Sequence, residues 1–172
     1  MKYGYIERER RFLIKNLPLE LRLDGEYRCI SDRYFPKTHL RLRRITTPEG
    51  QLIQQKFARK QLMSDSSHAS ITNLYLDPNE YQLLSSLGGL EIHKRRYRYA
   101  YGEYMFGIDV FEGQLSGLVL GEVEFPTDEA MELFRSPDFC TVEVTDEPFF
   151  RGGHLATVQA DVLHRELRAI FE

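Results

Sequence analysis

The chain has 172 residues, 42% of them hydrophobic and 28% charged, which is typical of one globular domain and unlike disordered, collagenous or coiled-coil proteins. No apolar run reaches the roughly 18 residues of a membrane-spanning helix. Charge rather than a signal-peptide core follows Met1, so we expect a cytoplasmic protein with no membrane partner. The two cysteines, Cys29 and Cys140, are too few for a disulfide scaffold and lack metal-ligand spacing.

The net charge of −3 hides a strong asymmetry along the chain. Residues 1–98 hold 19 Lys and Arg against 11 Asp and Glu, whereas residues 99–150 hold one Arg against 12 acids. Such an asymmetry can mark a nucleic-acid surface with an acidic tail. Here the acids alternate with Phe, Val, Ile and Leu at the spacing of strands, so they belong to folded structure, and we expect no nucleic-acid partner.

Alternation of polar and apolar side chains is the dominant local signal. At the start of the chain it places Glu7, Glu9 and Arg11 on one face of a strand. Similar runs follow at 26–35, 39–46, 51–59, 70–76, 91–101, 103–111, 118–125 and 141–145. Turn residues separate several of them, including Pro48-Glu49-Gly50 and the segment from Gly113 to Gly117. We predict eight or nine strands in a mostly antiparallel barrel that is closed or nearly closed.

Three helices are expected among these strands. Asp77-Pro78-Asn79-Glu80 combines an N-cap, a proline at N1 and an acid at N3, and predicts a helix to about Leu87. Thr127-Asp128-Glu129 predicts a second helix, which ends near Arg135. An apolar stripe predicts a third over residues 155–171, with its apolar face in the core. Because no linker or repeat interrupts the chain, we expect a single α+β domain over residues 1–172.

Several predicted strands repeat charged residues on one face. These faces carry Glu7, Glu9 and Arg11; Arg41 and Arg43; Gln54 and Lys56; Lys94, Arg96 and Arg98; Asp109; and Glu122 and Glu124. For any single strand, a solvated outer surface explains the pattern. For all strands together a barrel with a polar interior explains it better, because the opposite faces are not consistently apolar either.

A polar interior of this kind suits an anionic ligand together with a metal ion. Clustered Arg and Lys favour a polyanion, since arginine donates paired hydrogen bonds to phosphate oxygens. Carboxylates among these bases would repel the anion unless a hard cation such as Mg²⁺ or Mn²⁺ bridged them. Glu7-x-Glu9 and Glu122-x-Glu124 each place two carboxylates on one strand face, where such a cation could bind.

The order and spacing of these blocks resemble the CYTH superfamily, the triphosphate tunnel metalloenzymes, over nearly the whole chain. The segment from Ile6 to Ile14 resembles its amino-terminal ExExK signature. Further blocks are similar to its paired-arginine strand (His39-Leu40-Arg41-Leu42-Arg43), its strand ending in lysine (52–56), its K-x-R-Y strand (Lys94-Arg95-Arg96-Tyr97), its D-x-F-x-G…GL…AEVE block (108–113, 117–118 and 121–125) and its EVT…LA ending (Glu143-Val144-Thr145, then Leu155-Ala156).

The resemblance implies an eight-stranded antiparallel tunnel that binds a triphosphate with Mg²⁺ or Mn²⁺. It implies metal ligation by Glu7, Glu9, Asp109, Glu122 and Glu124. It implies phosphate binding by Arg11, Arg41, Arg43, Lys56, Lys94 and Arg96. Its implied catalytic residues are Glu7, Glu9, Arg11 and Glu124. The expected partner is a small molecule that contains a triphosphate, and the expected assembly is a monomer or a homodimer.

The chain departs from the family pattern at identifiable positions. Arg11 stands where the family has lysine, Gly107 where an acid often lies, and the segment from Ser70 to Leu74 lacks an R-x-E-x-E pattern. We expect a metal-dependent triphosphatase that prefers inorganic tripolyphosphate, because no pocket for a base or sugar is identifiable. The alternatives are an adenylyl cyclase that makes cyclic AMP and a degenerate tunnel that binds polyphosphate without turnover. A weaker one is an RNA-binding barrel that uses the basic half.

Overall fold

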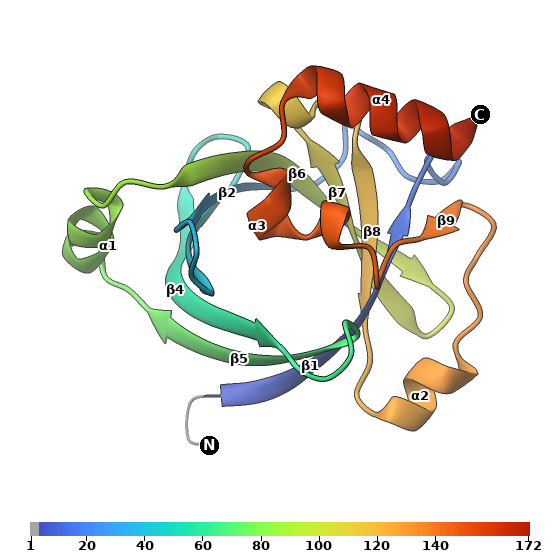
Figure 1. Cartoon of the computed structure of the whole chain (residues 1–172), viewed down its shortest axis with the longest axis horizontal. Coiled ribbons are helices and arrows are strands. Elements are labelled where there is room, and N and C mark those ends of the chain that lie inside the picture. The colour runs from blue at the N-terminus through green and yellow to red at the C-terminus, as the bar shows by residue number, and fades with distance from the viewer. Residues whose placement is uncertain (1–3) are drawn as a thin grey trace.

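A computed structural model describes residues 4–172 as a closed antiparallel barrel flanked by short helices (Figure 1). Its strands are β1 (Gly4–Leu13), β2 (Arg28–Tyr34), β3 (Leu40–Thr46), β4 (Leu52–Leu62), β5 (His68–Tyr75), β6 (Leu90–Tyr101), β7 (Tyr104–Phe111), β8 (Val119–Glu124) and β9 (Val142–Glu143). They are ordered β5-β4-β3-β2-β6-β7-β8-β1-β9. The pairing of β1 with β5 closes the barrel, so the predicted eight-stranded fold is confirmed, with β9 as a short addition.

Strand β1 closes the barrel by changing partners along its length. Its first half pairs with β5, with Glu7 opposite Ala69, and its second half pairs with β8, with Glu9 opposite Glu124. Paired residues in an antiparallel sheet point to the same face, and successive residues alternate between faces. The face that carries Glu7, Glu9 and Arg11 is therefore the lumen face.

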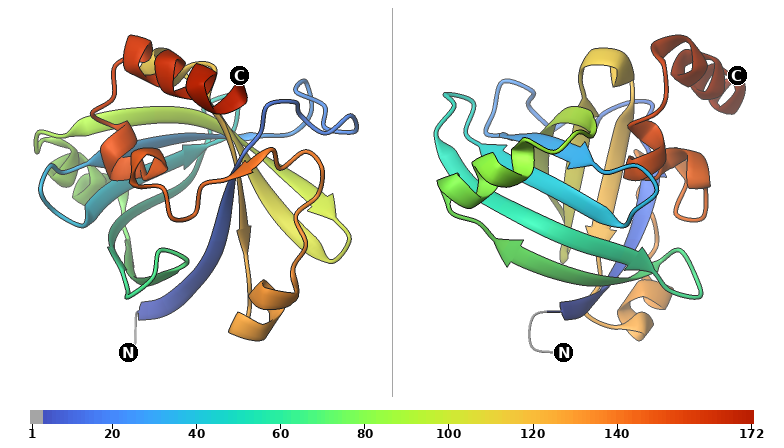
Figure 2. Two further views of the ribbon diagram at one scale, coloured as in Figure 1. Left: turned by 45° about the vertical axis from the view of Figure 1, so that its right-hand side comes forward. Right: turned by 60° about the vertical axis from the view of Figure 1, so that its left-hand side comes forward.

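Four helices lie outside the barrel: α1 (Pro78–Ser85), α2 (Asp128–Leu133), α3 (Gly152–Leu155) and α4 (Ala160–Phe171). The predicted capping box is present at α1, where Asp77 and Glu80 cap each other's backbone, and Thr127 caps α2 as expected. Helices α2 and α4 lie at opposite ends of the molecule (Figure 2). Within the described residues, no helix combines the length and the apolar character needed to cross a bilayer.

The carboxy-terminal prediction is wrong in one respect, because residues 155–171 do not form one helix. Helix α3 ends at Leu155, and α4 begins only at Ala160, after the extended residue Gln159. In the turn between them, the amide of Val158 donates to the carbonyl of Leu155. Both Leu155 and Val158 still reach the core, since a turn and a helix can place apolar side chains on the same side at this spacing.

Two apolar clusters flank the charged part of the lumen. One contains Leu13, Phe111 and Leu120, which are lumen residues by strand parity, and it joins them to α3 and α4 through residues such as Leu163. This cluster fills one end of the barrel. The other cluster covers the outer face of β1, β6, β7 and β8, where Phe134 packs against the rings of neighbouring aromatic residues. Charged side chains therefore occupy the remaining length of the lumen.

Candidate active site

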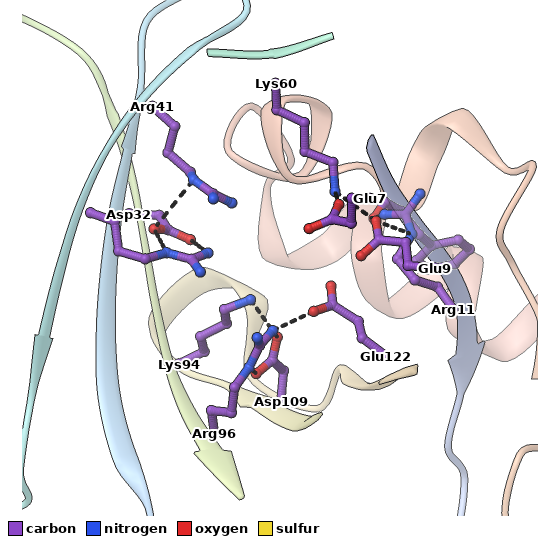
Figure 3. Close-up of polar contacts among 12 residues, drawn as sticks. Glu7, Glu9, Arg11, Asp32, Arg41, Lys60, Lys94, Arg96, Asp109 and Glu122 are labelled. Atoms are coloured by element: carbon purple, nitrogen blue, oxygen red, sulfur yellow. Dashed lines mark hydrogen bonds and ion pairs between the residues drawn. The ribbon is translucent and has the colours of Figure 1, made fainter. Parts of the chain in front are cut away.

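Seven strands contribute charged side chains to the lumen, and Figure 3 shows most of them converging on one space. They include Glu7, Glu9 and Arg11 of β1, Arg28 and Asp32 of β2, Arg41 and Arg43 of β3, Lys56 and Lys60 of β4, Lys94, Arg96 and Arg98 of β6, Asp109 of β7, and Glu122 and Glu124 of β8. A cavity of about 910 Å³ lies beside α2, where its lining includes Arg96, Glu122 and Glu124. These side chains form three clusters with different charge balances.

The first is the basic cluster of Arg41, Arg43 and Lys56, which surrounds the buried Asp32. Arg43 donates from Nε and Nη2 to the two oxygens of Asp32, both at 2.6 Å. Arg41 lies farther away, with Nε 3.9 Å from the carboxylate, and this buried Nε has no hydrogen-bond partner among the described residues. Burial alone would raise the pKa of Asp32, but Arg43 and Arg41 hold it well below its usual range.

Lys56 adds a further positive charge to this basic cluster. It lies directly opposite Arg43 on the neighbouring strand, and no carboxylate of residues 4–172 is within ion-pairing distance of it. Burial, and then repulsion from Arg43 and Arg41, lowers the pKa of Lys56 to about 8. One carboxylate, Asp32, therefore faces three cations, and the cluster has an excess of positive charge.

The second is the acidic cluster of Glu7, Glu9 and Glu124. Glu7 and Glu9 are only 9% and 7% exposed, and Glu124 lies opposite Glu9 in the register of β8. The ammonium of Lys60 bonds to Glu7 and, at 2.7 Å, to Glu9. Even so, burial and then the charge of Glu9 raise the pKa of Glu7 to about 7. Partial burial and Glu9 also raise the pKa of Glu124. These carboxylates therefore have too little positive charge around them.

The third is the mixed cluster of Lys94, Arg96, Asp109 and Glu122, in which the charges balance. Asp109 is fully buried. It accepts a hydrogen bond from Lys94 and two hydrogen bonds of 2.6 Å from Nε and Nη2 of Arg96. Arg96 also donates a hydrogen bond to Glu122. Burial would raise the pKa of Glu122, but Arg96 and Lys94 hold it well below its usual range. A β-carbon at Gly107 would lie 3.3 Å from Nε of Arg96, so the absence of a side chain there makes room for the guanidinium.

Arg11 links the lumen wall to the carboxy-terminal segment. It donates from Nη1 to the carbonyl of Phe150 at 3.0 Å and from Nη2 to that of Thr145 at 3.4 Å. Its Nε lies 3.9 Å from Glu9. A lysine has one terminal nitrogen and could not reproduce this fork. Arg11, which stands where the resembled family has lysine, thus contacts two carbonyls from two separate nitrogens, while its predicted role with phosphate stays a prediction.

The predicted metal ligands are brought together only in part. Glu7 and Glu9 lie side by side and offer the carboxylate oxygens that Mg²⁺ and Mn²⁺ prefer, with Glu124 on the adjacent strand. Asp109 is not with them, because Lys94 and Arg96 occupy both of its oxygens. Within residues 4–172, no group of three or more His, Cys, Asp or Glu side chains is arranged to hold a metal ion. The carboxylates of Glu7 and Glu9 thus have the ligand chemistry that a divalent cation needs, and in this structure the ammonium of Lys60 bonds to both of them.

Two residues of the site were missing from the sequence-based set, Asp32 and Lys60. Asp32 could have been noticed, because aspartate is depleted in strand interiors and needs a partner when buried. Lys60 shares the parity of Lys56, but the strand was predicted to end at residue 59, whereas β4 continues to Leu62. Outside the lumen, Glu143 pairs with Arg10 at 2.5 Å.

Comparisons with known proteins find similarity to inorganic triphosphatases in sequence and in fold. The chain is 29% identical over 160 residues to the inorganic triphosphatase of Nitrosomonas europaea. The aligned region covers 87% of this chain and 96% of that protein. It is 34% identical over 64 residues to the inorganic triphosphatase of Acetivibrio thermocellus, and this shorter aligned region covers 37% of this chain and 40% of that protein. A solved inorganic triphosphatase structure has the same fold, with a TM-score of 0.57, 24% identity, and coverage of 88% of this chain and 95% of the other. No protein-family model matches.

Proposed function

We propose that this chain is a member of the CYTH-like family of triphosphate tunnel proteins and a metal-dependent triphosphatase that hydrolyses the terminal phosphoanhydride of a linear triphosphate. Inorganic tripolyphosphate is the substrate that we favour. The names of the two triphosphatase relatives support this proposal, and one of them matches this chain over 96% of its own length.

The observation that carries the proposal is the charge imbalance across the lumen. Arg41 and Lys56 lie on one side without enough anions, and Glu7 and Glu9 lie on the other without enough cations. A linear triphosphate would neutralise the first side and a divalent cation the second. A ligand that combines the two, a metal triphosphate, therefore complements both at once.

The side chains have separable roles in this proposal. Arg41, Arg43 and Lys56 bind the phosphates from one side, while Asp109 positions Lys94 and Arg96 for the same task. Arg11, as a further phosphate ligand, would have to turn from the carbonyls that it now contacts. Mg²⁺ or Mn²⁺ held by Glu7 and Glu9, with Glu122 and Glu124 nearby, would neutralise phosphate charge and acidify the attacking water.

Catalysis then requires a base and an attack in line with the leaving group. The water oxygen forms a bond to the terminal phosphorus, the bridging P–O bond breaks, and the products are orthophosphate and pyrophosphate. Glu124, which is exposed at the cavity and has a raised pKa, accepts the proton of the water. Cationic side chains stabilise the charge that develops on the leaving pyrophosphate.

A second candidate, a tunnel that binds polyphosphate without turnover, is favoured by the uncharged lumen face of β5. Its lumen-facing residues are Ala69, Ile71, Asn73 and Tyr75, and none of them is charged. We further propose a cytoplasmic monomer or homodimer, and the free thiols of Cys29 and Cys140 are compatible with a reducing compartment.

Phosphate release from tripolyphosphate with Mg²⁺ or Mn²⁺ tests the proposal. We expect release by the wild type, none by the Glu7→Gln/Glu9→Gln double variant, and unchanged release by Glu49→Gln, which alters an exposed turn. Binding without release by well-folded wild-type protein would replace the hydrolase with the binding tunnel. Cyclic AMP as a product from ATP would identify a cyclase instead.

A further inference from the structure

Lys60 neutralises the carboxylates that the proposed function assigns to a metal ion. We propose that Lys60 is a built-in counter-cation: its ammonium holds Glu7 and Glu9 in the metal-free protein, and it has to leave them when a divalent cation binds. The inference rests on the proposed function, because it takes these two glutamates as metal ligands. It makes Lys60 a residue that sets the metal affinity of this chain.

The contact of Lys60 with Glu7 depends on the small residues of β5. Lys60 of β4 lies opposite Ile71 of β5, and Glu7 of β1 lies opposite Ala69 of the same strand. The two side chains thus come from strands separated by β5, about 10 Å apart in a sheet with normal strand spacing. Ala69, which faces the lumen opposite Glu7, has only a methyl side chain and leaves room for the ammonium to approach this carboxylate. The uncharged face of β5 is what lets Lys60 reach β1.

Lys60 is also the main source of positive charge for this glutamate pair. Among residues 4–172, Lys60 is the cation that hydrogen-bonds to both carboxylates. Nε of Arg11 lies 3.9 Å from Glu9, and the terminal nitrogens of Arg11 bond to backbone carbonyls. A divalent cation at the same oxygens would stand within a few ångströms of the ammonium. At this burial the repulsion between the two is strong, so both cannot occupy the pair.

The side chain of Lys60 has somewhere to go when it is displaced. It is 27% exposed, three times as much as either glutamate side chain at 9%. Figure 3 shows its stem extending toward the carboxylates of Glu7 and Glu9 from the top of the view. A lysine stem is flexible and its ammonium needs no fixed orientation, so the partly exposed side chain can turn toward solvent without backbone movement.

Binding of Mn²⁺, followed from the electron paramagnetic resonance signal of the free ion, tests the inference without turnover. We expect Lys60→Gln to bind Mn²⁺ about tenfold more tightly than the wild type, since a competing charge has been removed. Arg59→Gln is the matched control, because Arg59 is the neighbouring cation on the exposed outer face of β4. Its affinity should equal that of the wild type. Glu7→Gln/Glu9→Gln should lose the site.

The outcomes separate this inference from the proposed function. Equal affinities of wild type and Lys60→Gln, with binding lost in the double glutamate variant, would overturn the role of Lys60 and leave the metal ligands standing. Unchanged binding in the double glutamate variant would overturn the ligands themselves. Should Lys60→Gln fail to fold, a crystal structure of the Mn²⁺-loaded wild type decides the point. An ammonium still bonded to Glu7 and Glu9 in it contradicts displacement.

Discussion

Asn in place of Asp32 should destabilise the protein strongly, although Asp32 is not itself a phosphate ligand. The carboxylate is 1% exposed and accepts two hydrogen bonds of 2.6 Å from Arg43. Removing one partner of a buried ion pair costs about 3–5 kcal/mol, because the other charge stays buried. The amide keeps one acceptor oxygen for Arg43, so we expect about 3 kcal/mol, the lower end of that range. For a chain of this size that lowers the melting temperature by about 6–12 °C.

Urea denaturation of Asp32→Asn beside Asp24→Asn measures this effect with a matched control. Asp24 also accepts two hydrogen bonds from an arginine, Arg22, but both side chains are more than 70% exposed. Exposed pairs of this kind contribute little to stability, so we expect no measurable change for Asp24→Asn. If Asp32→Asn unfolded at the same urea concentration as the wild type, the claim that this carboxylate holds the basic cluster together would be refuted.

Two further changes address the cations of the lumen. Because the pKa of Lys56 lies at about 8, its charge is present below that pH and is lost above it. The affinity of the metal-free protein for tripolyphosphate, measured by calorimetry, should therefore fall between pH 7 and 9.5 relative to Lys56→Arg, which stays charged; parallel profiles would contradict this. Arg11→Lys should lose the paired contacts to the carbonyls of Phe150 and Thr145, which lowers the free energy of unfolding by about 1–2 kcal/mol. Equal urea midpoints for this variant and the wild type would refute the expectation.

Much of the fold could be predicted because its signals are local. Alternation within each strand shows which residues share a face, and a turn signal such as Pro48-Glu49-Gly50 separates one strand from the next. The barrel, the order of the elements and the lumen faces of Glu7 and Arg41 follow from such patterns. The carboxy-terminal helix was misjudged for the same reason, since its stripe does not distinguish the turn at Val158 from a further helical turn.

The pairing of charges within the lumen could not be predicted in the same way. Lys60 bonds to Glu7 across the intervening strand β5, and the two residues are 53 positions apart in the sequence. This contact depends on the register of β4 against β5 and of β5 against β1. The same holds for Arg96, whose partners Asp109 and Glu122 come from two other strands. Strand parity shows that a side chain enters the lumen, but only the closed barrel determines which opposite charge it finds there.

The missing charges of β5 have different consequences for binding and for chemistry. A positive charge near the glutamate pair can come from any strand that borders the same part of a closed lumen, and Lys60 supplies one from β4. The described lumen residues of β5 are Ala69, Ile71, Asn73 and Tyr75, so this strand places no acid in the lumen. Hydrolysis therefore depends on whether the carboxylates of β1 and β8 suffice to hold the metal and accept the proton. Tight Mn²⁺ and tripolyphosphate binding without phosphate release would locate the deficiency in those absent acids, because every cationic part of the site would then be shown to work.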